Sequence, residues 1–254
     1  MKSVIAVANF SLCTITFSFL LTSCMEIDNF DEPGARISGK LIDSTTGELY
    51  QTDQDDVHVR IWEMSYSTNP SPQDLSVKMD GTYNREHLFS GTYDMVPFDG
   101  SWWPCDTVRN VKIGNGGTTQ DFVVTPYLKI KDFQAELEQN TDGEYNLRMS
   151  CRLFAPITDG LPQVREIRPF LSDNHFCGAA NHIDYYYSDV YRINLRKMWS
   201  ALGDMDSGEG FNTYEIVVPV KKGWHYWVRM GANVNDERQK FNYSEIKEII
   251  VPNS

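Results

Sequence analysis

The sequence predicts an all-β protein built from two tandem β-sandwiches. Three observations lead to this fold class. Apolar and polar residues alternate in many short segments, which places successive side chains on opposite faces of a strand. Turn-forming pairs such as Thr46-Gly47, Asp80-Gly81 and Asp142-Gly143 separate these segments at short intervals. Outside residues 188–202, no stretch after the N-terminal apolar run shows the period of an amphipathic helix.

Residues 34–126 are expected to form the first sandwich. In one alternating segment, Val57, Val59 and Ile61 would face the same side of a pleated sheet. The pair Asp80-Gly81 is a hairpin signal between two further strands. The expected strands are Arg36–Asp43, Val57–Trp62, Leu75–Met79, Tyr83–Leu88, Gly91–Pro97, Val108–Ile113 and Gln120–Thr125.

Residues 127–254 are expected to form a second sandwich, of immunoglobulin or fibronectin type. Pro126 interrupts the chain after a strand, so the domain boundary is placed there. An insertion is expected near residues 173–210, and the apolar residues of its part 188–202 fit either a helix or an irregular segment. The expected strands are Tyr127–Phe133, Glu144–Phe154, Asn212–Val220, Tyr226–Ala232 and Ile246–Val251.

The first half carries a family resemblance in the order of its short motifs. The order is Ser38-Gly39-Lys40-Leu41-Ile42-Asp43, then Gly47, then Val57-His58-Val59-Arg60-Ile61, then Asp80-Gly81-Thr82-Tyr83, and last Gly91-Thr92-Tyr93. In this order the motifs resemble the prealbumin-like, carboxypeptidase-regulatory-like module. The resemblance covers roughly residues 34–126, and it implies that Gly39 allows a tight strand entry and that the later motifs open and close the central hairpin.

The first 23 residues have the pattern of a signal peptide. Lys2 supplies a positive charge, and Val4–Leu21 is uncharged and rich in apolar residues. The run Leu21-Thr22-Ser23-Cys24 has the bulky, small, small, Cys order that the lipoprotein-processing peptidase of bacteria accepts. We therefore expect Cys24 to become the N-terminus and to carry fatty acids such as palmitate, which hold a protein durably when more than one chain is present. The alternative is an uncleaved transmembrane anchor.

Residues 24–33 are expected to be a lipidated acidic tether. Four of the nine residues from Met25 to Pro33 are acidic and none is basic. Such a run is typical of a solvated, flexible segment. It also resembles the surface-export signal of Bacteroidota lipoproteins, which implies an outer-membrane protein that faces the cell exterior.

The charge balance limits the classes of partner. The chain has 35 Asp and Glu residues against 23 Lys and Arg residues, for a net charge of −12. This balance argues against nucleic acid, whose phosphates require a basic face. It also argues against binding to anionic lipid, so contact with the membrane is expected through the lipid anchor only. Neutral ligands such as sugars carry no such conflict.

Residues that could carry chemistry form no catalytic or metal-binding pattern. The chain has no phosphate-binding glycine loop, nucleophile elbow or metalloprotease helix, so neither an enzyme nor a cofactor is expected. His175 and His182 flank Cys177 without the spacing of zinc-ligand pairs. The disulfide pairing of Cys105, Cys151 and Cys177 cannot be chosen from sequence.

Aromatic residues make up 13% of the chain, and three groups of them are candidates for ligand binding. An aromatic ring offers its face to the C–H face of a sugar, while nearby polar groups bind the hydroxyls. Two adjacent tryptophans in the turn-like segment 98–104 are the first choice for an exposed platform, since both cannot enter one sheet face. The other groups fit a half-buried strand or a core equally well. The candidates are Trp102, Trp103, Tyr185, Tyr186, Tyr187, Trp224 and Trp227.

The whole chain is similar to a family of Bacteroidota lipoproteins with a domain of unknown function. Members of that family are found beside the outer-membrane importer and its glycan-binding partner in polysaccharide-utilisation systems. The resemblance implies a non-catalytic surface lipoprotein that binds glycan or assists the uptake complex. The alternatives are a structural or assembly protein that binds a protein partner, and a glycoside hydrolase whose paired carboxylates lie far apart in sequence.

Overall fold

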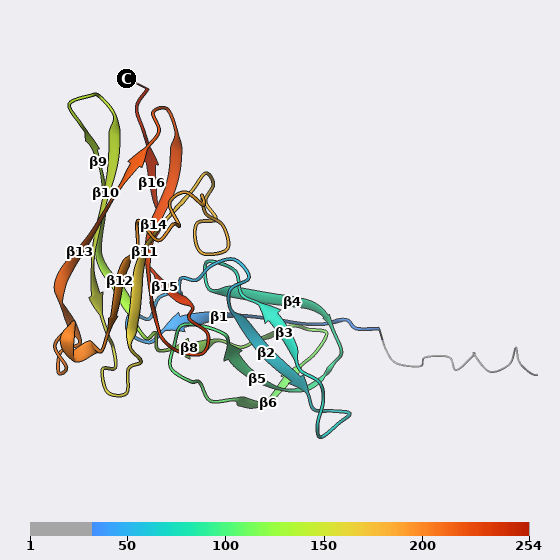
Figure 1. Ribbon diagram of the computed structural model, residues 1–254. Coiled ribbons are helices and arrows are strands. Elements are labelled where there is room, and N and C mark those ends of the chain that lie inside the picture. Colours follow the sequence, from blue (N-terminus) through green and yellow to red (C-terminus); the bar gives the residue numbers. More distant parts are fainter. Residues whose placement is uncertain (1–31, 254) are drawn as a thin grey trace, which may run out of the picture. The chain divides into compact units, whose positions relative to one another are not determined.

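The computed structural model describes residues 32–253, and within them the predicted all-β fold class is confirmed (Figure 1). In this part of the chain the only helical element is the 3-10 turn η1 (Trp199–Ala201). No helix among these residues is long and apolar enough to cross a bilayer. The predicted signal peptide, Cys24 and most of the acidic tether lie outside the described residues.

The first half consists of two four-stranded sheets. One contains β1 at its centre, paired antiparallel with β4 and parallel with β7 and β8. The other has the order β3-β2-β5-β6 and is antiparallel. The bounds are β1 (Ala35–Asp43), β2 (His58–Glu63), β3 (Gln73–Ser76), β4 (Thr82–Leu88), β5 (Gly91–Phe98), β6 (Val108–Ile113), β7 (Thr118–Thr119) and β8 (Phe122–Val124). Alternate residues of β1 are buried, and Val57, Val59 and Ile61 join them in one core, as their spacing predicts.

The second half again consists of two sheets. One has the order β13-β10-β9, and the other has the order β12-β11-β14-β15 with β16 also paired to β14. The bounds are β9 (Lys129–Gln139), β10 (Tyr145–Phe154), β11 (Val164–Ser172), β12 (Ile193–Lys197), β13 (Glu209–Val220), β14 (His225–Val234), β15 (Phe241–Tyr243) and β16 (Lys247–Ile250). Residues 188–202 therefore do not form an amphipathic α-helix: they contain β12, which pairs with β11, and the single 3-10 turn η1.

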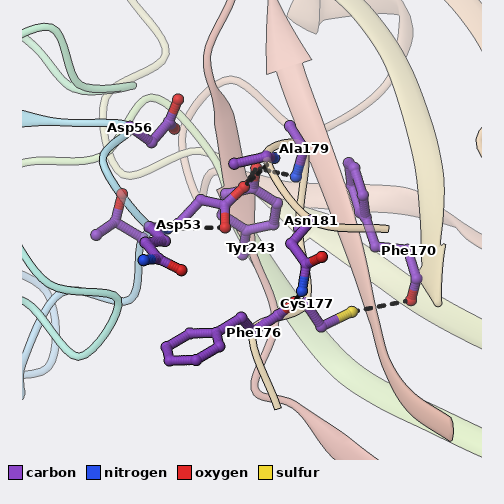
Figure 2. Close-up of polar contacts among 12 residues, drawn as sticks. Asp53, Asp56, Phe170, Phe176, Cys177, Ala179, Asn181 and Tyr243 are labelled. Atoms are coloured by element: carbon purple, nitrogen blue, oxygen red, sulfur yellow. Dashed lines mark hydrogen bonds between the residues drawn. The ribbon is translucent and has the colours of Figure 1, made fainter. Parts of the chain in front are cut away.

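A buried polar cluster joins the two halves of the protein (Figure 2). Asp53, between β1 and β2, accepts a hydrogen bond from the amide nitrogen of Ala180 at 2.7 Å and lies 3.4 Å from the hydroxyl of Tyr243. Asn242 binds the first half as well, since its Nδ2 donates to the hydroxyl of Tyr50 at 2.9 Å. Buried polar groups with partners on both sides hold the two sandwiches in one arrangement.

Candidate functional site

The expected exposed platform of Trp102 and Trp103 is wrong. Trp102 is only 5% exposed and belongs to the core of the first sandwich, where its ring lies edge-on to Tyr50 at 5.2 Å between centroids. Trp103 is half-buried and packs against the core of the second sandwich, beside Tyr127. The two adjacent side chains do point to opposite sides, as expected for extended backbone. A hydrophobic core covers each side, which sequence could not show.

Part of each of the other two groups, namely Tyr185, Tyr186 and Trp224, meets in one cavity instead. It has a volume of about 320 Å³ and lies between the loop after β11 and the connection from β13 to β14. We call it the aromatic cavity. Its lining residues are Ile183, Tyr185, Tyr186, Pro219, Val220, Lys221, Trp224 and Tyr226. Four of these eight are aromatic, so the lining has the mixture of flat apolar surface and few polar groups that small-ligand sites have.

The connection from β13 to β14 presents Trp224 at one side of the aromatic cavity. The amide nitrogen of Trp224 donates to the carbonyl of Lys221 at 3.3 Å, which closes a tight turn. Gly223 has a φ of +71°, a backbone conformation that glycine adopts without steric cost. Because β13 and β14 belong to different sheets, this turn bridges the two layers of the sandwich. Trp224 therefore lies at the rim and is 41% exposed.

The loop after β11 supplies the tyrosines on the other side. The amide nitrogen of Ile183 donates to the carbonyl of Leu171 at 2.8 Å, and that of Tyr186 donates to Ile183 at 2.9 Å. This backbone turn directs the side chain of Tyr186 into the protein and that of Tyr185 toward solvent. Tyr186 is buried, whereas Tyr185 is 57% exposed and accepts a hydrogen bond from the hydroxyl of Tyr191 at 2.9 Å.

Tyr226 joins the two sides of the aromatic cavity. Its ring lies edge-on to Tyr186 at 6.0 Å between centroids, and the two hydroxyls are 3.3 Å apart. Its other neighbour is Trp224, with nearly parallel rings 5.8 Å apart. Burial raises the pKa of the Tyr186 hydroxyl, and the bond to Tyr226 raises it further. The phenol is therefore neutral at physiological pH and can both donate and accept hydrogen bonds.

Among the described residues that line the aromatic cavity, Lys221 alone has an ionisable basic side chain. Its Nζ lies 4.5 Å from the centroid of the Trp224 ring, a cation–π contact. At an exposed position such a contact contributes about 0.5–1 kcal/mol. The ammonium group is thus oriented at the rim by the ring without being enclosed.

Tyr187 and Trp227, although predicted as candidates, do not line the aromatic cavity. Tyr187 packs on Phe170 and under the guanidinium of Arg168, 4.5 Å from its ring centroid. Trp227 stacks on His225, with centroids 4.0 Å apart, and its Nε1 donates to Glu248 at 3.2 Å. Trp227 points away because neighbouring residues of a strand face opposite sides.

Sequence reasoning missed Tyr226 and Lys221. The signal for Tyr226 was present, since it lies two positions after Trp224 and alternation places residues i and i+2 of a strand on one face. No local signal marked Lys221. Within residues 32–253, the hollow beside Trp103, of about 370 Å³, has two aromatic side chains in its lining, Trp103 and Phe122.

Comparison with known proteins identifies both halves of the chain. The family model described as "Protein of unknown function (DUF3823) N-terminal domain" matches residues 35–125, and "Domain of unknown function (DUF3823_C)" matches residues 128–248. None of the curated proteins matches the chain.

Solved structures share the fold. A DUF3823 family protein from Bacteroides uniformis has a TM-score of 0.69 at 22% identity, over 87% of this chain and 100% of that one. A second protein from the same organism, described as a "putative carbohydrate binding protein", has a TM-score of 0.66 at 20% identity, over 86% of this chain and 100% of that one. A DUF3823 family protein from Parabacteroides merdae has a TM-score of 0.60 at 20% identity, over 87% and 100%.

Proposed function

The chain belongs to the DUF3823 family, and from its aromatic cavity we propose that it is a non-catalytic surface lipoprotein of the bacterial outer membrane that binds a glycan. The observation that carries the proposal is the convergence of Tyr185, Tyr186, Trp224 and Tyr226 on one cavity. These residues come from two segments about 40 positions apart, so their meeting is a property of the fold.

The chemistry of the aromatic cavity suits a sugar ring. The partly exposed rings of Tyr185 and Trp224 offer apolar surface to the C–H faces of a pyranose. Phenolic hydroxyls and the ammonium group of Lys221 supply hydrogen bonds for ring substituents. The description of the second Bacteroides uniformis relative supports the same class of ligand.

The proposed location rests on the N-terminal sequence. The apolar run Val4–Leu21 and the run Leu21-Thr22-Ser23-Cys24 support export and lipidation, and the acidic residues that follow support transfer to the cell surface. Metabolic labelling with radioactive palmitate tests this part. The wild-type protein should incorporate label and sediment with membranes, and Cys24→Ala should do neither.

Affinity electrophoresis of the full-length protein through gels with different polysaccharides tests glycan binding. At least one polysaccharide should retard the wild type, and Trp224→Ala and Tyr185→Ala should abolish that retardation. Trp227→Ala is the matched control, since it changes the same residue type on β14 outside the aromatic cavity. Retardation that survives Trp224→Ala and is lost in Trp227→Ala would place the site elsewhere. Sugar released from a polysaccharide, with loss of release on one Asp or Glu substitution, would indicate a hydrolase instead.

A second candidate function is the binding of a protein partner, such as an outer-membrane importer complex. The exposed rings of Tyr185 and Trp224 support it, because aromatic side chains of this kind are frequent hot spots of interfaces. If no polysaccharide retards the wild type, and an importer subunit co-purifies with it but not with Trp224→Ala, this function replaces glycan binding.

A further inference from the structure

We infer that the ligand of the aromatic cavity is an acidic saccharide, a sugar that carries a carboxylate, and that Lys221 recognises its charge. The inference rests on the proposed function and specifies its class of ligand. Three observations on residues 32–253 support it: the absence of acidic residues from the lining, the absence of an ion-pair partner for the ammonium group of Lys221, and the place of that group beside the aromatic rings.

In the part of the chain that the structure describes, no aspartate or glutamate lines the aromatic cavity, although the chain has 35 acidic residues and a net charge of −12. In a protein of this charge, a surface hollow without a carboxylate is a place where an anion meets the least repulsion. A cationic amino sugar would find no counter-charge there. The lining therefore favours an anionic ligand over a cationic one.

Lys221 forms no ion pair with any residue of 32–253. The nearest charged residues in the chain do not pair with Lys221. Lys222 lies 3.2 Å from Glu144, and Asp184, beside Tyr185 in the chain, has a fully exposed side chain and does not line the aromatic cavity. The positive charge of Lys221 is thus uncompensated at the rim.

The contact with Trp224 places this charge where a bound sugar would need it. Nζ lies 4.5 Å from the centre of the indole, and the indole lines the same cavity as the tyrosines. A cation–π contact at an exposed position is weak, so a carboxylate can draw the ammonium group into a charge-assisted hydrogen bond. The carboxylate of a uronic acid lies at the edge of the pyranose ring, so the ring can stack while its edge meets Lys221.

The test compares acidic polysaccharides with their own carboxyl-reduced forms, which keep the linkages and remove the charge. Polygalacturonate, alginate and polyglucuronate serve as probes for the full-length protein. At least one acidic form should bind the wild type about tenfold more tightly than its reduced form, and this preference should decrease as salt rises. Lys221→Met should bind both forms equally, whereas Lys222→Met, the matched control, should keep the preference.

The outcomes separate this inference from the proposed function. Equal binding of acidic and reduced forms by the wild type, or an undiminished preference in Lys221→Met, would overturn the acidic ligand and leave glycan binding intact. If only neutral polysaccharides retard the wild type, the acidic ligand is likewise overturned and glycan binding stays intact. If none of the acidic, reduced or neutral polysaccharides binds the wild type, glycan binding itself fails. Lys221→Met should melt only slightly below the wild type, because the side chain is exposed and the substitution removes one weak cation–π contact.

Discussion

Arg229 of β14 lies against Asp53 of the first sandwich, with Nη2 3.5 Å from Oδ1, and both side chains are almost completely buried. The guanidinium also donates from Nη1 to the carbonyl of Thr52 at 2.8 Å and lies 3.6 Å from the centre of the Tyr243 ring. Arg229 therefore connects the two sandwiches, since it contacts Asp53 and Thr52 of the first and the ring of Tyr243 of the second.

Substitution of Asp53 should destabilise the whole molecule. Asp53→Asn leaves the guanidinium of Arg229 buried without a counter-charge, a change that costs about 3–5 kcal/mol. Urea unfolding followed by tryptophan fluorescence measures it as a lower midpoint. Asp206→Asn, an exposed aspartate, is the matched control and should change the free energy of unfolding by less than about 0.5 kcal/mol. Similar midpoints for the two variants would show that the pair contributes nothing.

Substitution of Trp102 should mainly reduce stability, whereas substitution of Trp224 should mainly reduce polysaccharide binding. Trp102→Ala removes a large side chain from a core and should lower the free energy of unfolding by about 3–5 kcal/mol. Trp224→Ala should lower it by less, because part of that ring is already in water. Retardation by polysaccharide should show the reverse order, with loss in Trp224→Ala and retention by the folded fraction of Trp102→Ala. Loss of binding in Trp102→Ala alone would contradict this placement.

Gly39 should not tolerate even a methyl group. A Cβ at this position would lie 1.8 Å from the carbonyl oxygen of Gln120 and 2.7 Å from the Tyr83 ring. Gly39→Ala should therefore destabilise the first sandwich by about 1–3 kcal/mol through overpacking. Gly114→Ala is the control, since nothing lies within 4 Å of its added Cβ. Thermal melting should separate the two variants, and equal melting temperatures would argue against close approach at Gly39.

The protein should be less stable at alkaline pH, because the thiols of Cys151 and Cys177 are buried and that of Cys105 is half-buried. Burial raises the pKa of Cys105 from 9.0 to about 11 and the pKa values of Cys151 and Cys177 from 9.0 to about 12. Between pH 9 and these values the folded protein keeps protons that the unfolded chain releases, so the free energy of unfolding falls as pH rises. Below pH 9 both states are protonated and this contribution is constant.

Urea midpoints measured from pH 7 to pH 11 test the thiol contribution. Cys151→Ala removes one titrating group, so its midpoint should fall less steeply above pH 9 than that of the wild type. The substitution also leaves a cavity, which lowers the urea midpoint of Cys151→Ala by the same amount at every pH and so does not change the slope. An unchanged slope above pH 9 would mean that Cys151 does not contribute to the alkaline loss.

Part of the candidate site was visible in the sequence, and the rest depended on contacts between distant segments. The tyrosine run and Trp224 were recognisable as candidates because aromatic residues between turn signals stand out locally. Trp102 stood out for the same reason, yet a core covers it, because exposure depends on what the rest of the chain packs against a residue. Tyr226 follows from the two-residue period of its strand. Lys221 has no local signal, because its contact with the Trp224 ring and its lack of an ion-pair partner within residues 32–253 are features of the tertiary structure.

The all-β architecture and the family could be predicted from the sequence, since both follow from local order: alternation of side chains, turn residues and short motifs. The packing of distant segments decides which aromatic residues meet, which are covered by a core, and whether the three cysteines form a disulfide. Cys105, Cys151 and Cys177 are free thiols, although their number in the chain permitted a pair. Such outcomes depend on distances between residues far apart in the chain, and these distances are set only when the two sandwiches pack.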